Sequence, residues 1–229
     1  MRFEICRAAL KIFLAGILLS GCAGIPFEPV RFSPVEGINP GIVRKDFEGR
    51  LAGKFEVLES AVVRYRYREF AALGYTEVDS QENSLGVAGF TPMGVKIFEI
   101  KSAGEKFEYA FSFPQIEKKI DPGKFAHGMA EDVRRIYLGR VPQASAEVVK
   151  AKDRIYYRQA SGKGALEFVF GGPEMALVEK RYREGRRELW RVRYFEYRAK
   201  GSKIYPSKIF FENRVRKYSL ALRLKEILA

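Results

Sequence analysis

The sequence predicts a mainly antiparallel β protein with a helical element (α+β), built as a large curved sheet or a barrel. Apolar and polar residues alternate with a period of two through most of the chain after Asp46, which is typical of strands that bury one face only. Turn-forming residues separate these stretches at intervals of about ten to fifteen residues, so hairpins joined in sequence are expected. This spacing leaves room for about ten or eleven strands. One segment with a helical period interrupts the series.

The N-terminus has the features of an export signal followed by a lipid attachment site. Three basic residues precede an apolar run over Ile12–Leu19, which is too short to span a bilayer because a spanning helix needs about 20 apolar residues. The run ends in Leu19-Ser20-Gly21-Cys22, which resembles the lipobox of bacterial lipoproteins at every position. The resemblance implies a signal peptide over residues 1–21 and a diacylated Cys22. Because Ala23 rather than an aspartate follows, it also implies an outer-membrane anchor facing the periplasm. The alternative is a plain secretory signal with an unrelated cysteine.

Residues 22–46 differ in composition from the rest of the chain and are predicted to be a tether. Four prolines lie among glycine and polar residues, and no apolar period is present. A proline-rich spacer rises at most ~3.1 Å per residue, so this stretch would hold the domain up to roughly 70 Å from its lipid. A short helix around Gly41–Phe47 that docks on the domain would shorten that reach. Residues 47–229 are expected to form a single domain.

The chain is strongly basic, with 41 Lys and Arg residues against 28 Asp and Glu residues and a formal net charge of +13. In a cytosolic protein this surplus would favour nucleic acid, but export removes that partner. The anionic partners that remain are lipopolysaccharide, phospholipid head groups and acidic glycans, to which Coulomb attraction would draw the protein. The alternative is a solvated basic face. No disulfide is expected, because Cys6 leaves with the signal and Cys22 carries lipid.

The alternating stretches also predict which side chains face the interior. Val63, Tyr65 and Tyr67 alternate with three arginines, so a single strand is expected over residues 63–68. A shift of one residue exchanges the two faces of a strand, so each assignment depends on register. The expected apolar interior comprises Phe55, Val57, Tyr65, Tyr67, Ile97, Phe107, Phe111, Phe125, Met129, Val133, Ile136, Phe168, Phe170, Trp190, Val192, Tyr194, Leu220 and Leu222.

One amphipathic helix is predicted from Pro122 to Leu138. Asp121 is a suitable N-cap, the proline fits the first helical position, and Gly139 is placed to end the helix. Its apolar stripe should lie against the sheet. The opposite side, expected to be polar, carries Glu131, Asp132, Arg134 and Arg135.

Two stretches resemble the outer-membrane lipoprotein localisation factors, the LolA and LolB family. Residues 89–100, Gly-Phe-Thr-Pro-Met-Gly-Val-Lys-Ile-Phe-Glu-Ile, match that family's strand, Pro-Leu-Gly turn and next strand, and residues 205–225 resemble its last hairpin. The resemblance implies a half-open barrel whose helical lid encloses an apolar cavity for the acyl chains of a lipoprotein or lipid. It also implies a LolA-like periplasmic carrier as a partner.

The turn formed by Phe90, Pro92, Met93 and Gly94 is a second place where a membrane contact is expected. In LolB the leucine of the corresponding turn projects and helps place lipid cargo into the membrane, and Met93 stands at the matching position. An exposed apolar tip gains about 0.8 kcal/mol per methylene when it enters a bilayer. The alternative is that Met93 folds back onto its own sheet or is a freely variable residue of the turn. The strong positive charge departs from LolB and leaves the cargo open.

The sequence offers little for catalysis. His127 is the only histidine; it lies off the apolar stripe of the predicted helix, and no side chain beside it has metal-ligand spacing. Neither enzymatic activity nor a metal or cofactor is therefore expected. If the interior leaves a cavity of lipid size, the protein is expected to be a carrier or acceptor of acyl chains. If the interior packs solid, the protein is expected to be a structural or assembly lipoprotein. A hydrolase would need carboxylates from distant strands to meet in a polar cleft.

Overall fold

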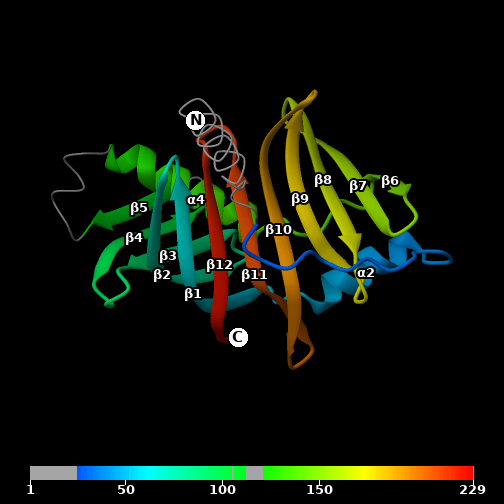
Figure 1. Ribbon diagram of the computed structural model, residues 1–229, viewed down its shortest axis with the longest axis horizontal. Helices are drawn as coiled ribbons and strands as arrows, with labels where there is room; N and C mark the ends of the chain where they lie inside the picture. Colours follow the sequence, from blue (N-terminus) through cyan, green and yellow to red (C-terminus); the bar gives the residue numbers. More distant parts are fainter. Residues whose placement is uncertain (1–24, 105, 112–120, 229) are drawn as a thin grey trace, which may run out of the picture.

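The computed structural model describes residues 25–104, 106–111 and 121–228, so the export signal and Cys22 lie outside the described residues. In this part of the chain twelve antiparallel strands form one curved sheet, in the order β5-β4-β3-β2-β1-β12-β11-β10-β9-β8-β7-β6 (Figure 1). The expected fold class, a large curved antiparallel sheet with a covering helix, is confirmed. The elements are α2 (Pro40–Arg50), β1 (Lys54–Tyr65), β2 (Arg68–Asp79), β3 (Ser84–Phe90), β4 (Lys96–Ala103), β5 (Lys106–Phe111), α4 (Pro122–Tyr137), β6 (Glu147–Lys150), β7 (Arg154–Ser161), β8 (Gly164–Gly171), β9 (Ala176–Glu184), β10 (Arg187–Lys200), β11 (Lys203–Asn213) and β12 (Tyr218–Leu228).

Strands β1 and β12 join two meanders, β1–β5 and β6–β12, into the single sheet. Their register places Ala61 opposite Leu222 and Val63 opposite Leu220. Directly opposed side chains lie on the same face, so these residues share the inner, helix-covered face. The first and last strands of the described chain therefore build the centre of the sheet.

Residues 63–68 form a hairpin, which corrects the prediction of one continuous strand. Strand β1 ends at Tyr65, β2 begins at Arg68, and Arg66 adopts a left-handed φ of 55°. The alternation concealed the turn because neither turn residue is one of the glycines or asparagines that usually mark it. Tyr67 is consequently 104% exposed and Tyr65 42% exposed, so neither belongs to the buried interior.

Residues 25–39, here called the strap, pack on the outer face of the second meander. The Phe27 ring meets Phe195 of β10 edge-on with centroids 5.4 Å apart, and the guanidinium of Arg154 lies 3.9 Å from the Phe32 ring centroid. Gly171 makes this approach feasible, because a Cβ there would lie 2.7 Å from the Phe32 ring. The prediction of a long free spacer is therefore wrong for the strap.

Helix α2 follows the strap and covers the inner face of the same strands. The Asn39 side chain caps it by accepting a hydrogen bond from the Gly41 amide at 2.8 Å. Its buried Phe47 meets Phe170 of β8 edge-on with centroids 5.1 Å apart. The alternative of a short docked helix is thus the one that the structure has, and β8 is covered on both faces.

Helix α4 forms where the sequence predicts it. Asp121 accepts a hydrogen bond from the Lys124 amide at 3.0 Å, and the helix ends at Tyr137, two residues before Gly139 with its positive φ. The expected polar side is corrected at Asp132, which is only 1% exposed because Asn213 of β11 and Tyr218 of β12 contact its carboxylate. Among the described residues, no helix is long and apolar enough to span a bilayer.

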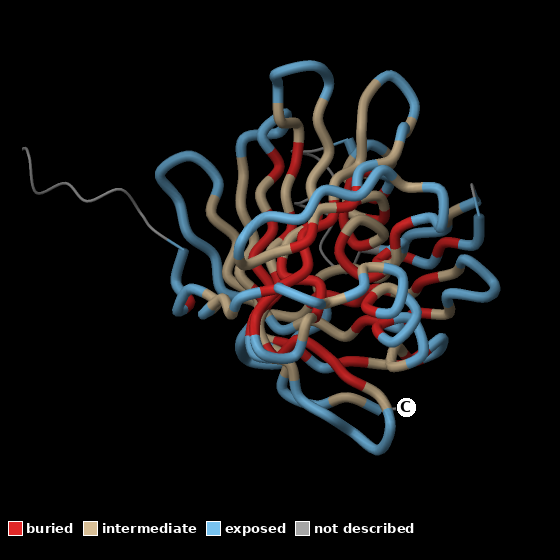
Figure 2. The backbone as a smooth tube through the Cα atoms, turned by 90° about the vertical axis from the view of Figure 1, so that its right-hand side faces the viewer, coloured by how far each residue is buried: buried red, intermediate tan, exposed pale blue. Residues whose placement is uncertain are grey.

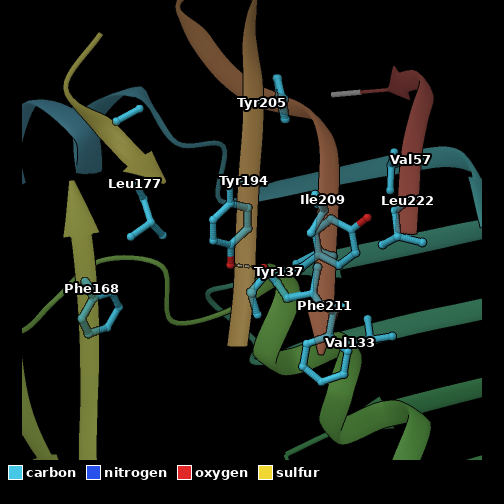
Figure 3. Close-up of a cluster of buried hydrophobic side chains, with 14 of the residues drawn as sticks. Val57, Val133, Tyr137, Phe168, Leu177, Tyr194, Tyr205, Ile209, Phe211 and Leu222 are labelled. Atoms are coloured by element: carbon cyan, nitrogen blue, oxygen red, sulfur yellow. Dashed lines mark hydrogen bonds between the residues drawn. The ribbon is translucent and has the colours of Figure 1, made fainter. Parts of the chain in front are cut away.

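The core lies between the inner face of the sheet and the two helices. Figure 3 shows Tyr194, Ile209 and Phe211 converging from neighbouring strands toward Tyr137 and Val133 of α4, and each of these side chains is at most 5% exposed. Figure 2 shows buried backbone gathered in the middle of the molecule and exposed hairpin ends around it. This arrangement fixes one side of α4 against a rigid sheet.

Candidate functional site

The inner face beneath the C-terminal half of α4 is packed solid. Four different strands contribute five side chains here that are each 0% exposed: Val57, Ile100, Val192, Ile209 and Phe211. A gap of lipid size would leave exposed surface on these side chains, so their packing excludes one among them. In this part of the interior, the structure has the solidly packed core and not the cavity of lipid size.

Arg134 ties the C-terminal half of α4 to the turns of the first meander. Its Nη1 donates to Asn83 Oδ1 at 2.6 Å, and its Nη2 donates to Ser102 Oγ and to the Gly104 carbonyl, both at 2.8 Å. Charge-assisted hydrogen bonds from one planar guanidinium fix orientation as well as distance. The helix is therefore held at a set angle to β3 and β4.

A buried hydrogen-bonded group holds the last turn of the helix. The Tyr137 hydroxyl donates to the carboxylate of Glu59, which also accepts from Thr76 Oγ1 at 3.2 Å. Burial raises the pKa of Glu59 to about 7, although both hydrogen bonds favour its charged form. Tyr194 adds a hydrogen bond from its hydroxyl to the Ile136 carbonyl at 2.8 Å.

Lys180 of β9 lies beneath the end of the helix. Its Nζ donates to the Leu138 carbonyl at 2.7 Å, and the side chain is 2% exposed. Burial lowers the pKa of Lys180 to about 7, and the charges of Arg140 and Arg135 act in the same direction. A cation at a helix C-terminus also meets the negative end of the helix dipole, which stabilises this contact.

Asp132 completes the attachment on the other flank. Its carboxylate accepts from the Asn213 amide at 3.2 Å, from the Tyr218 hydroxyl, and from the guanidinium groups of Arg135 at 2.5 Å and Arg216 at 3.1 Å. Hydrogen bonds of this kind offset the desolvation of a buried carboxylate. Both meanders are thereby linked through one helix.

The N-terminal half of α4 is attached differently. Phe125 meets Phe98 of β4 edge-on with centroids 5.6 Å apart, and His127 meets Phe107 of β5 at the same distance. Among the described residues, the hydrogen bonds and ion pairs that join α4 to the rest of the protein start at Glu131. Apolar contacts are non-directional, so in the described contacts this half is held by packing and not by directed bonds to the sheet.

The inner face continues past this half of the helix as a partly exposed apolar surface. Val63 lies opposite Phe70 on β2 and opposite Leu220 on β12, and Phe70 is 51% exposed. Small residues line the next rows, and Phe98 occupies the space above Gly89, where a Cβ would lie 2.4 Å from its ring. We call the surface formed by Val63, Phe70, Leu220, Phe98, Phe125 and Met129 the apolar mouth.

Most of the predicted interior residues lie where they were expected. Ile97 is an exception: Ile100 is buried in the core and Phe98 packs against it, so Ile97 belongs to the opposite face of β4. Here the strand register differs by one residue from the prediction. The side chain of Phe111 lies outside the described residues. Buried in the core are Phe55, Val57, Val133, Ile136, Phe168, Phe170, Trp190, Val192, Tyr194 and Leu222, and packed at its edge are Phe107, Phe125, Met129 and Leu220.

The turn between β3 and β4 projects Met93 into solvent, where it is 92% exposed. The Gly94 amide donates to the Thr91 carbonyl at 2.9 Å, the Val95 amide donates to Thr91 Oγ1 at 3.2 Å, and Gly94 has a φ of +83°. The alternative in which Met93 folds back onto the sheet is thereby excluded. Phe90 and Pro92 flank the turn, which presents an apolar tip on a rigid frame.

A cavity of about 560 Å³ lies on the outer face, between the strap and β7–β10. Phe27, Val30 and Phe32 of the strap form one wall, and Val169 and Val178 form the other. Sequence reasoning missed this site, although the unbroken apolar run from Phe168 to Phe170 is the pattern of a strand buried on both faces.

His127 is surface-exposed, with its Nδ1 4.0 Å from Glu131. Within the described ranges, His, Cys, Asp and Glu side chains form no group of three arranged to hold a metal ion.

Comparison with known proteins identifies relatives in structure but not in sequence. No family model and no curated protein matches the chain. A LolA superfamily protein from Nitrosomonas europaea superposes with a TM-score of 0.55 at 13% identity, over 84% of this chain and 94% of that one.

Two further solved structures superpose on the chain in the same way. One, described as an outer membrane lipoprotein-sorting protein domain from Vibrio parahaemolyticus, superposes with a TM-score of 0.51 at 8% sequence identity, over 82% of this chain and 90% of that one. The other, a DUF1329 family protein from Desulfovibrio piger, superposes with a TM-score of 0.55 at 6% sequence identity, over 82% of this chain and 90% of that one. At these identities the likeness shows a shared LolA-like fold.

Proposed function

We propose that this protein binds an acyl chain of a lipid or lipoprotein at the apolar mouth and helps to insert it into the outer membrane. The observation that carries the proposal is the uneven attachment of α4. Its C-terminal half is fixed by Arg134, Asp132 and Tyr137, whereas its N-terminal half rests on aromatic rings beside exposed apolar surface. An acyl chain that enters there replaces one set of apolar contacts by another.

The same proposal includes a lipid anchor at Cys22 and a periplasmic location. The lipobox resemblance supports the anchor, and the docked strap sets how close it lies. Two residues, Ala23 and Gly24, lie between Cys22 and Ile25, so at most roughly 10 Å of extended chain separates the lipid from the folded domain. The domain would then sit directly on the membrane, within reach of anionic lipid or lipopolysaccharide, with Met93 as a second insertion point and a LolA-like carrier as donor of the cargo.

One observation favours the alternative, a structural or assembly lipoprotein of the cell envelope. The central part of the interior is solid, and a solid core is what a scaffold needs. The two functions differ in the fate of a lipid offered to the protein. A carrier binds it at the mouth, whereas a scaffold of the same fold ignores it.

The test uses purified protein that lacks the signal and carries Cys22→Ser. We expect a fluorescent fatty acid to bind, and Phe125→Glu to weaken binding at least about tenfold, because a charge beneath the helix opposes entry of an acyl chain. Val149→Glu is the matched control, since Val149 is a 53% exposed apolar residue on the edge strand β6. Equal binding by both variants, or no binding by the parent protein, would favour the scaffold.

A further inference from the structure

Four hairpin turns lie together at one end of the strands. Tyr65 at the end of β1 pairs with Tyr218 at the start of β12. Asn213, the last residue of β11, pairs with Tyr218 on one side and with Trp190 of β10 on the other. The β9–β10 turn directly precedes Arg187, the first residue of β10, and the β7–β8 turn lies next to it because β8 pairs with β9. Figure 1 shows these hairpin ends directed to the same side of the molecule, at the top.

These four turns are basic and exposed. The name basic rim is used here for residues 65–68, 162–163, 184–187 and 214–217. Eight cations and one carboxylate lie on it, and all nine residues are exposed: Arg66, Arg68, Lys163, Arg186, Arg187, Arg214, Arg216, Lys217 and Glu184.

Most of these cations have no counter-charge within the domain. Arg214 and Arg216 are paired with carboxylates at 3.0 Å and 3.1 Å. In the part of the chain that the structure describes, the other six cations form no ion pair, and Glu69 beside the rim is already paired with Arg64 at 2.6 Å. Glu184 balances at most one of the six, so at least five positive charges remain for a partner.

The turns at the other end of the strands have the opposite charge. One cation and three carboxylates lie in turns 80–83, 151–153, 172–175 and 201–202: Lys152, Glu82, Asp153 and Glu174. Lys200 and Lys203 flank the last of these turns, where they donate to backbone carbonyls. A charge difference between the two sets of turns orients the protein in the field of an anionic surface, with the basic rim toward it.

Exposed apolar side chains accompany the cations of the rim. Tyr67 at the tip of the β1–β2 turn is 104% exposed, and Val215 at the tip of the β11–β12 turn is 56% exposed. Tyrosine rings among arginines and lysines are typical of a bilayer interface, where the ring enters the head-group region and the cations meet phosphates. Separate projecting tips contact a flat surface together, whereas a soluble acidic chain is held along a continuous groove.

We infer that the basic rim docks on an anionic phospholipid bilayer, with Tyr67 and Val215 in the head-group region and the unpaired cations on lipid phosphates. The inference deepens the function proposed above and rests on the membrane location proposed there, because it names the surface that faces the lipid. Val63 and Phe70 of the apolar mouth pair with each other just below the β1–β2 turn. A docked rim therefore brings the mouth close to the acyl chains of the bilayer.

The test measures binding of the protein with Cys22→Ser to vesicles of phosphatidylcholine, alone or mixed with phosphatidylglycerol. We expect tighter binding to the anionic vesicles, weakened by salt. The triple variant Arg68→Gln/Arg187→Gln/Lys217→Gln should weaken this binding about 100-fold, because each cation near an anionic bilayer gives about a fivefold gain in affinity.

The matched control removes the same net charge at the other end of the strands. Lys152, Arg198 and Lys225 are exposed there, and their joint replacement by Gln should leave anionic vesicle binding within about threefold of the parent. Both triple variants should melt with the parent, since none of the six cations is in an ion pair of the described residues. Equal weakening by the two triple variants would show an effect of net charge alone and overturn the rim.

Two further measurements separate a bilayer from a soluble polymer and from acyl-chain binding. The emission of Tyr67→Trp should shift to the blue on anionic vesicles, whereas that of Val149→Trp, at a 53% exposed position of β6, should not. An unshifted Tyr67→Trp, or rim-dependent binding to dextran sulfate without binding to vesicles, would overturn the bilayer as partner. Fatty-acid binding should be the same in the parent and the rim variant; its absence from both would refute the acyl-chain site and leave the rim standing.

Discussion

The buried carboxylate of Glu59 should make the stability of this protein depend on pH in an unusual direction. Glu59 joins Tyr137 of α4 to Thr76 of β2, and burial raises its pKa from 4.5 to about 7. Below pH 4.5 the carboxyl is protonated in both the folded and the unfolded chain and has no effect. Between pH 4.5 and 7 the unfolded chain releases the proton first, so the free energy of unfolding falls as the pH rises.

The size of this effect follows from the two pKa values. Full ionisation of a group whose pKa is 4.5 unfolded and about 7 folded costs about 3 kcal/mol at pH 8, and under about 1 kcal/mol at pH 5. Glu59→Gln keeps an oxygen that can accept from Tyr137 but removes the charge. We therefore expect the variant to be more stable than the parent by about 3 kcal/mol at pH 8 and to match it closely at pH 5.

Urea denaturation of both proteins from pH 5 to pH 8 measures this difference. Lys180, whose pKa is lowered to about 7, also makes stability depend on pH, but it is present in both proteins and cancels in the difference. Glu99→Gln, at a half-exposed carboxylate paired with Lys96 at 2.8 Å, is the matched control and should show no gain at pH 8. A Glu59→Gln variant that is less stable by the same amount at pH 5 and pH 8 would refute the reasoning.

Two further predictions concern the membrane turn and the strap. Met93→Glu should leave the free energy of unfolding within about 0.5 kcal/mol of the parent, because Met93 is 92% exposed. It should weaken binding to phospholipid vesicles at least roughly tenfold, because the side chain contributes only when it enters a bilayer. Equal vesicle binding by Met93→Glu and Val149→Glu would show that the turn does not insert into the membrane. Phe27→Ala should destabilise the protein by about 2–4 kcal/mol and open the strap to protease, because Phe27 is 7% exposed and packs on Phe195. Ile42→Ala, at a 66% exposed position of α2, should do neither, and a strap that stays protease-resistant in Phe27→Ala would contradict its docking.

The periodicity of apolar residues predicted most of the strands and helix α4. Burial of one face produces a period of two in a strand and a period of about 3.6 in a helix. Trp190, Val192 and Tyr194 alternate with arginines, and all three lie on the inner face as expected. The same signal failed at Tyr67, where a hairpin turn carries no glycine or asparagine, and at Ile97, where alternation gives no information on which face is inner. Local pattern therefore determines the existence of a strand better than its ends or its face.

The remaining features depend on contacts between distant segments. The sequence of the strap is that of a proline-rich spacer. Only the apolar residues Val169 and Phe195, on the outer face of the sheet, indicate a surface on which the strap can pack. Asp132 lies on the polar side of its helix and is buried only because β11 and β12 rise beside it. Each of these positions becomes informative once the sheet order is known.

The central claim, that an acyl chain enters beneath the N-terminal half of α4, is tested most directly by photocrosslinking. A fatty acid with a photoreactive group near its tail is bound to the protein, irradiated, and the labelled residues are identified by mass spectrometry. The account predicts labels at the apolar mouth, on Phe98, Phe125, Met129 or Leu220. Labels confined to the outer cavity between the strap and β7–β10, at Phe32 or Val178, would contradict it.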